Sequence, residues 1–201
     1  AYNDAGQMLF MNGYNDYYVQ ARGNVIRQDL LDKLGLDIPV TYDDYHDVLE
    51  AFKNDGIEYP IWMPQAVQGG ALLSAGFGVS GYTLQQTGTH FFQKDGTVYS
   101  SFLTEEYREF LKLMAQWYSD GLIYHDFPFY GEQLAFRDMD KIGSGAVACF
   151  YSETGDMASF KDFSGDENFL LTAMAPVSKE KGDTIYMSDK KPSRADDVRW
   201  A

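Results

Sequence analysis

The stretch from Lys94 to Phe127 constrains the fold most, because it contains a helix whose start and end are both marked by residue type. Thr104 is placed to accept a hydrogen bond from a backbone amide at the helix start. Glu105 and Glu106 put negative charge in the first turn, where the helix dipole favours it. Gly121 supplies the end, since glycine readily adopts the left-handed conformation that closes many helices. The stretch therefore predicts a helix with caps at both ends.

One face of this predicted helix is apolar. The residues that recur at intervals of three and four are Tyr107, Phe110, Leu111, Met114, Trp117 and Tyr118. Such spacing places side chains on one side of a helix, so we expect this face to pack on a core. In particular, Trp117 and Tyr118 are expected to pack the domain rather than contact a ligand. Lys94-Asp95-Gly96 predicts a turn before the helix, followed by a short strand at 97–99.

Strands and helices alternate along the rest of the chain. Helices are expected at 24–34, 42–53, 66–75, 129–139 and 157–160, and strands at 7–11, 59–63, 145–150 and 168–176. Thr41 and Asp44 open the second helix in a capping-box pattern, and Ser152 or Thr154 is expected to cap the last one. Alternation of this kind predicts an α/β fold with a short central sheet flanked by several helices. No shift in composition divides the chain, so we expect one domain over 1–201.

Composition excludes several classes of partner. The 201 residues are 45% hydrophobic, which is enough for a real core, and carry a formal net charge of -14. A surface this acidic repels nucleic acids and anionic membranes. Cys149 is the only cysteine, so neither an internal disulfide nor a cysteine-based metal cluster is possible. No run of 18 apolar residues is present, and we expect no membrane span.

The motifs of catalysis and of nucleotide binding are missing. The chain has neither a phosphate-binding loop nor a dinucleotide fingerprint, and its three histidines lack metal-ligand spacing. Asp138 and Asp140 begin like a calcium loop, but the required glycine and terminal glutamate are missing. We therefore expect no cofactor and no metal. Carboxylates are abundant, so spacing alone leaves open the acidic pair of a glycosidase.

A binding site fits the composition better. Sugars are held by aromatic rings and by planar polar side chains, and aromatic residues make up 16% of the sequence. Candidate residues lie at or just after the ends of two predicted strands and in a glycine-rich segment, where ligand sites often form. They are Trp62, Gln65, Gln68, Phe77, Tyr151, Glu153 and Asp156. Core packing is the alternative interpretation for Phe77, and an ordinary surface position is the alternative for Gln65, Tyr151 and Glu153.

Three segments together resemble a known family. They are IRQDLLDKLGLDIPVTYDDYHDVLEAFK at 26–53, KDGTVYSSFLTEEYREFLKLMAQWYSDGLIYHDF at 94–127 and FRDMDKIGSGAVACFYSETGDM at 136–157. In this order they resemble the maltose-binding-protein-like extracellular solute-binding proteins of sugar ABC importers. The resemblance implies a periplasmic-binding-protein type II lobe. In this family many members carry a stacking tryptophan where this chain has Glu153-Thr154-Gly155-Asp156, so Tyr151 is expected to supply the ring instead.

The resemblance also implies which part of such a protein this is. Family members have two lobes that hold the ligand between them, and this chain is similar to the second lobe only. Segments 1–18 and 172–187 resemble the strands that cross between the lobes, and 188–201 is expected to be a disordered tail. The loops after Pro60–Met63 and after Phe150 would face the cleft. The opening AYNDAGQMLF does not look like a natural start, so we expect a mature fragment or an excised domain.

The function that the resemblance implies is non-catalytic. The parent protein is expected to bind a sugar or oligosaccharide for uptake through an ABC transporter, with the permease subunits as partners. It is expected to be a monomer, located outside the cell as a surface lipoprotein or in the periplasm, with the signal and anchor outside this chain. Two other hypotheses remain open at this stage, namely a glycan-active hydrolase domain that uses a carboxylate pair and a surface carbohydrate-adhesion module.

Overall fold

The computed structural model describes residues 12–13, 22–63, 73–79, 91–126, 138–183, 185 and 199–200. The chain divides into two compact units, one formed by Ala1–Gln20 with Ser188–Ala201 and the other by Ala21–Met187. In the first unit, β1 (Asn12–Gly13) and β8 (Arg199–Trp200) pair antiparallel. The predicted disordered tail and the predicted strand at 7–11 fall almost entirely outside the described residues.

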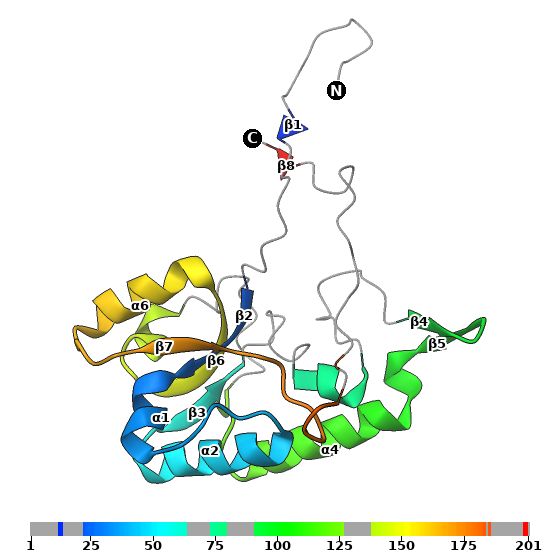
Figure 1. The fold of residues 1–201 in the computed structure, drawn as a ribbon, viewed down its shortest axis with the longest axis horizontal. Helices are drawn as coiled ribbons and strands as arrows, with labels where there is room; N and C mark the ends of the chain where they lie inside the picture. Colours follow the sequence, from blue (N-terminus) through cyan, green and yellow to red (C-terminus); the bar gives the residue numbers. More distant parts are fainter. Residues whose placement is uncertain are drawn as a thin grey trace, which may run out of the picture. The chain divides into compact units, whose positions relative to one another are not determined.

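The second unit is built on a four-stranded sheet with the order β3-β6-β2-β7 (Figure 1). The strands are β2 (Arg22–Arg27), β3 (Tyr59–Trp62), β6 (Val147–Glu153) and β7 (Leu171–Met174). Strands β3 and β6 are parallel, whereas β2 runs antiparallel to both of its neighbours. Helices connect most of these strands, so the predicted α/β class is confirmed.

Helices cover both faces of the sheet. On one face the core joins Ile26 and Cys149 of the sheet to α1 (Gln28–Leu34), α2 (Tyr42–Asn54) and α4 (Glu105–Ser119). On the other face, Val25 and Phe150 pack with α5 (Met139–Ile142) and α6 (Met157–Ser164). Neighbouring residues of one strand thus serve opposite cores, as the two-residue period of a strand requires.

The caps of α2 and α4 confirm the sequence prediction. The Thr41 hydroxyl accepts from the Asp44 amide at 3.1 Å, and the Asp44 carboxylate accepts from the Thr41 amide at 2.9 Å. This reciprocal pair is a complete capping box and lowers the pKa of Asp44. Thr104 accepts from the Tyr107 amide at 3.3 Å, and α4 is followed by Gly121 at a φ of 71°. The residue types at the helix ends therefore predict correctly where both helices begin.

The apolar face of α4 is narrower than predicted. Phe110, Met114 and Trp117 are buried, but Leu111 and Tyr118 are 47% and 43% exposed. Each exposed residue directly follows a buried one and so lies about 100° further around the helix. The Tyr118 hydroxyl donates to the His125 carbonyl at 3.0 Å instead of packing in the core. The expectation that Tyr118 packs the domain was wrong, whereas that for Trp117 is confirmed.

One predicted helix start and one predicted helix cap were also wrong. The helix expected at 24–34 begins only at Gln28, because the four residues before it belong to β2 and pair with strands on both sides. Pairing and burial on both faces override the helical spacing of this segment. Strand β6 continues through Ser152, so this residue does not cap α6, and Asp156 occupies the N-cap position without a capping bond from its side chain.

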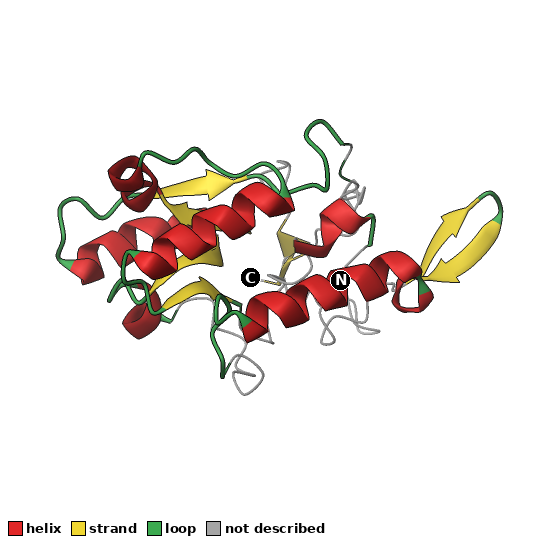
Figure 2. Cartoon of the chain, turned by 90° about the horizontal axis from the view of Figure 1, so that it is seen from below, coloured by secondary structure: helices red, strands yellow, loops and turns green. Residues whose placement is uncertain are grey.

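A hairpin precedes α4, as the turn residues predict. Strands β4 (Phe91–Lys94) and β5 (Thr97–Ser100) pair antiparallel around Asp95 and Gly96, which both have positive φ. The hairpin extends beyond the start of α4 (Figure 2). Most of the helix predicted at 66–75, and most of that at 129–139, lies outside the described residues; near the end of the former, η1 spans Ala75–Phe77.

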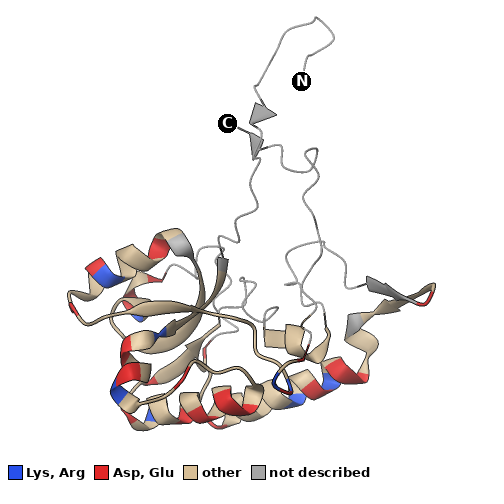
Figure 3. Ribbon diagram, viewed as in Figure 1, with Lys and Arg blue, Asp and Glu red and all other residues tan. Residues whose placement is uncertain are grey.

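Helices α2 and α4 carry acidic residues at several positions along their length (Figure 3). Glu109 of α4 is paired with Lys179 at 2.6 Å, and this bond lowers the pKa of the carboxyl group. Such exposed pairs contribute little to stability in water. Within the described residues, every helix is too short or too polar for a membrane span.

Candidate ligand site at the carboxyl edge of the sheet

Residues that face α2 form successive rows across the sheet. The middle row consists of Ile26, Cys149 and Ile61, which lie side by side on β2, β6 and β3. Two residues further along is the edge row, in which Asn24 lies between Tyr151 of β6 and Met174 of β7. Because residues two apart in a strand share a face, the edge row continues the same surface to the carboxyl end of β6.

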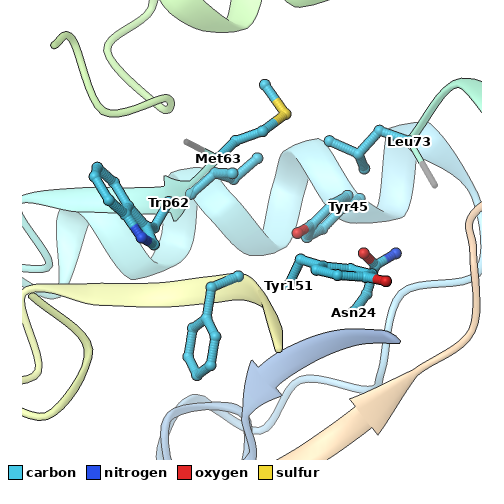
Figure 4. Close-up of a pocket in the computed structure, with 8 residues that line it drawn as sticks. Asn24, Tyr45, Trp62, Met63, Leu73 and Tyr151 are labelled. Carbon is cyan, nitrogen blue, oxygen red and sulfur yellow. The ribbon is translucent and has the colours of Figure 1, made fainter. Parts of the chain in front are cut away.

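A shallow pocket lies over the edge row (Figure 4). Its empty volume is about 240 Å³, part of which is open to solvent. Its described lining residues are Asn24, Tyr45, Ile61, Trp62, Met63, Leu73, Phe150 and Tyr151. The pocket thus sits at the carboxyl ends of the parallel strands β3 and β6, which is where ligands bind in open α/β sheets.

Few polar groups reach this pocket. Asn24 is 7% exposed, and its side-chain nitrogen Nδ2 has no hydrogen-bond partner among the described residues. Tyr151 is its register neighbour on β6 and is 5% exposed. In Figure 4 both side chains come from neighbouring strands beneath the Tyr45 ring of α2. The described polar side chains that line the pocket are therefore an amide beside a phenol, and the amide nitrogen itself is enclosed.

The buried acids around the pocket remain protonated at neutral pH. Burial raises the pKa of Tyr45 well above its usual value, and the neighbouring Cys149 raises it further. Burial also raises the pKa of the Cys149 thiol to about 12. A nucleophilic cysteine needs a lowered pKa and access to solvent, so this thiol is inert. None of the described lining residues carries a carboxyl or imidazole group. The described lining of the pocket therefore contains no ionised side chain at neutral pH.

Of the predicted site residues, Tyr151 and Trp62 line this pocket. Trp62 is only 1% exposed, because its ring packs edge-to-face on Tyr124 at 4.9 Å and lies 5.5 Å from the Lys141 ammonium. The Trp62 ring belongs to the core on the face of the sheet that α5 and α6 cover. Its side chain forms part of the pocket wall and is not exposed as a surface on which a sugar ring could stack.

Of the other predicted residues, the structure describes Phe77, Glu153 and Asp156. The Phe77 ring in η1 packs against the rings of Tyr42 and Phe110, with centroids 4.8 Å and 5.8 Å away. Phe77 is not among the described lining residues of the pocket, so its position matches the core alternative. Glu153 ends β6, and Asp156 follows at the start of α6. The structure does not describe Gln65 and Gln68, so their role stays a prediction, as does that of Glu153 and Asp156.

Sequence reasoning missed six of the described lining residues, namely Asn24, Tyr45, Ile61, Met63, Leu73 and Phe150. Asn24 had a usable signal, because it is a polar residue directly before the buried pair Val25 and Ile26. The helical interpretation of 24–34 hid that signal. Tyr45 lies on the buried side of α2, and its place over the edge row depends on how α2 crosses the sheet.

Comparisons with known proteins agree with this architecture. No protein-family model matches the chain. Lipoprotein LipO of Bacillus subtilis is 31% identical over 117 residues, which cover 51% of this chain and 21% of LipO. Among solved structures, the alginate-binding protein AlgQ2 matches with a TM-score of 0.63 at 22% identity, over 87% of this chain and 36% of AlgQ2.

Two further solved structures match to the same extent. An HMO-binding, ABC-transporter-associated solute-binding protein from Bifidobacterium longum infantis has a TM-score of 0.64 at 23% identity, over 88% of this chain and 38% of its own. FusA of S. pneumoniae, in complex with kestose, has a TM-score of 0.64 at 19% identity, over 88% and 37%. The chain thus spans less than two thirds of each of these proteins, and it has the fold of ABC-transporter solute-binding proteins.

Proposed function

We propose that this chain is the second lobe of an extracellular solute-binding protein that captures a sugar or oligosaccharide for an ABC importer. The observation that carries the proposal is the extent of the likeness in fold. The matched region covers 87–88% of this chain but only 36–38% of each matched protein. The matched proteins are described as an alginate-binding protein, an HMO-binding protein and a protein in complex with kestose. A match of this extent is what one lobe of a two-lobed protein would give.

The pocket at the carboxyl edge supports a neutral, polyhydroxylated ligand. Saccharides present apolar C–H surfaces together with hydroxyl groups, and they are bound by aromatic rings with a few well-placed hydrogen-bonding groups. Tyr151 and Asn24 provide both kinds of group, and the described lining residues are uncharged. In this proposal the ligand lies between this lobe and the other one, and a hinge motion at segments 1–18 and 172–187 closes the cleft.

The remaining parts of the proposal follow from the same role. The protein acts by binding and not by catalysis, and its partners are the permease subunits of the importer. The likeness to a lipoprotein supports attachment to the cell surface or a location in the periplasm. One copy of the parent protein, without a metal or cofactor, carries out this role.

Calorimetry of the full-length parent against a panel of oligosaccharides tests the proposal. We expect micromolar or tighter binding of at least one saccharide, and weak or undetectable binding of the same saccharide by the 201-residue chain, which offers half of the contacts. Tight binding by this chain alone would contradict the proposal that the ligand is held between two lobes. A panel without any binder, combined with binding of a peptide or another solute, would show that the substrate class is wrong.

No described feature favours a hydrolase or an adhesion module. The pKa values of the Asp44 and Glu109 carboxyl groups are both lowered from their usual values. A glycosidase acid instead needs a raised pKa. For an adhesion module the candidate aromatic residues should form an exposed patch, whereas Trp62 and Tyr151 are buried. Turnover of a chromogenic glycoside, abolished by replacing one cleft carboxylate, would reverse this conclusion.

A further inference from the structure

Tyr42, the first residue of α2, contacts two separate parts of the chain. Its backbone amide donates to the Ser178 carbonyl at 3.0 Å. Its side chain is buried, and the hydroxyl donates to the Leu73 carbonyl. Leu73 lines the pocket, whereas Ser178 belongs to 172–187, the segment at which the proposed function places a hinge. One residue therefore holds both the pocket wall and the segment that crosses between the lobes.

The Tyr42 hydroxyl fixes the backbone at the start of η1. Burial raises the pKa of Tyr42, and a hydrogen bond to the Gly76 backbone lowers it by less, so the hydroxyl keeps its proton at neutral pH. The hydroxyl thus bonds to the chain on both sides of Ala75, at Leu73 and at Gly76. A phenylalanine would keep the ring contact with Phe77 but would leave both backbone groups without this partner.

The backbone of η1 also packs directly against the crossing segment. A Cβ on Gly76 would lie 2.9 Å from the Ser178 Cα and would also meet the Val177 carbonyl oxygen, so only glycine fits between them. The Lys179 ammonium lies 4.4 Å from the centre of the Phe77 ring. Because closely packed groups transmit displacements, a shift of 177–179 must also move η1.

We propose that Tyr42 is a positioning residue for ligand binding, which holds the pocket wall at Leu73 in a fixed position relative to the crossing segment at Val177–Lys179. The inference rests on the proposed function and adds to it a residue that is not among the described lining residues of the pocket. When the cleft closes, movement of the crossing segment reaches Leu73 through η1 and Tyr42. Without the hydroxyl the wall is free to shift, and the ligand must order it on binding, which weakens the affinity.

Tyr42→Phe in the full-length parent tests the inference, because it removes the hydroxyl and keeps the ring. Calorimetry would use the tightest-binding saccharide of the panel, at a temperature well below the unfolding midpoint of each variant. We expect Tyr42→Phe to bind about tenfold more weakly, since two hydrogen bonds to the backbone are lost. Tyr118→Phe is the matched control, because its hydroxyl also donates to a backbone carbonyl, that of His125. It should bind as tightly as the unmodified parent.

Hydrogen exchange distinguishes positioning from a role in the fold alone. The Gly78 amide donates to the Ala75 carbonyl and the Ser178 amide to the Val40 carbonyl, both at 3.0 Å, so each amide reports on one of the two segments. In the parent, saturating saccharide should slow the exchange of both amides by a similar factor, because the segments move together. In Tyr42→Phe the two factors should differ. A tyrosine that only stabilises the fold would leave them similar, which would contradict the inference.

A second pair of variants tests the same contact if Tyr42→Phe does not fold. Lys179→Ala removes the ammonium over the Phe77 ring, whereas Glu109→Gln removes its salt-bridge partner and leaves the ammonium in place. Both residues are exposed, so neither change should cost much stability. We expect Lys179→Ala to weaken saccharide binding about threefold and Glu109→Gln to leave it unchanged.

The outcomes separate this inference from the proposed function. If the parent binds a saccharide and Tyr42→Phe binds it equally tightly, the inference is wrong and the proposed function stands. The inference is also wrong if Tyr118→Phe loses as much affinity as Tyr42→Phe, or if Glu109→Gln loses as much as Lys179→Ala. If no saccharide of the panel binds to the parent, the proposed function fails and the inference fails with it.

Discussion

The middle row and the edge row of the sheet lie on the same face, two residues apart on β2 and β6, yet they differ in chemistry. Ile26 and Cys149 of the middle row are fully buried beneath α2, whereas the edge row has an amide and a phenol at Asn24 and Tyr151. The difference shows where the sheet accommodates polar side chains. The row sealed by helices is apolar, while the row that borders the pocket contains polar side chains.

Introducing an amide into the middle row is expected to have the largest effect on stability. Ile26→Asn removes a fully buried side chain and buries an amide that cannot reach the pocket. We expect the free energy of unfolding to fall by about 3–5 kcal/mol, measured by urea denaturation of the 201-residue chain.

Ile26→Val is the control, because it shortens the same side chain without adding a polar group. It should cost only about 0.5–1.5 kcal/mol. If the two variants lose the same amount, the middle row tolerates an amide, and the contrast between the rows has no physical basis.

Gly76 of η1 and Gly23 of β2 differ in the space around them. A Cβ at Gly76 would lie 2.7 Å from the Tyr42 hydroxyl and 2.9 Å from the Ser178 Cα, and would also meet the Val177 carbonyl oxygen. We expect Gly76→Ala to destabilise the chain by about 1–3 kcal/mol, because backbone atoms must shift to admit the methyl group.

Gly23, which precedes the edge row on β2, provides the opposite case. A Cβ there would meet nothing within 4 Å. Gly23→Ala should therefore leave the midpoint of thermal unfolding unchanged or slightly higher, since alanine reduces the freedom of the unfolded chain. A large loss of stability in Gly23→Ala would show that the edge row is packed as tightly as the interior.

The same contrast explains how far the sequence could predict the structure. The helices α2 and α4 were predictable, because Thr41 and Thr104 cap them through bonds to residues three positions away. The start of α1 was not, because Asn24–Arg27 obtains its strand conformation from β6 and β7, which are more than a hundred residues distant in sequence. Local signals identify helix ends, but they do not reveal which strand lies at the centre of a sheet.

The residues that line the pocket likewise fall into those that the sequence could predict and those that it could not. Tyr151 was predictable, because it follows a continuous apolar run and so lies near the carboxyl end of a buried strand. Asn24 and Tyr45 reach the same pocket from β2 and α2, and only the tertiary arrangement brings them together. The sequence also could not separate the two roles of aromatic residues, since Trp62 and Phe77 are held by other rings.

The smallest expected effect concerns the middle row at alkaline pH. The Cys149 thiol has an ordinary pKa of 9.0, which burial raises to about 12 in the folded chain. Below pH 9 both the folded and the unfolded chain keep this proton, so stability is unaffected. As pH rises above 9 only the unfolded chain releases the proton, and the folded state loses stability until the pH reaches the folded pKa.

The loss should amount to less than about 1 kcal/mol between pH 8.5 and 9.5, because one proton contributes about 1.4 kcal/mol per pH unit only once the unfolded thiol is fully ionised. Urea denaturation at the two pH values would measure it. Cys149→Ala should show a smaller fall over this interval, although it is less stable at both values. Asn24→Val should keep the full fall, because the edge row contributes no thiol. If Cys149→Ala and the unmodified chain fall equally, the thiol is accessible to solvent, and the middle row is not sealed by the helices as the comparison requires.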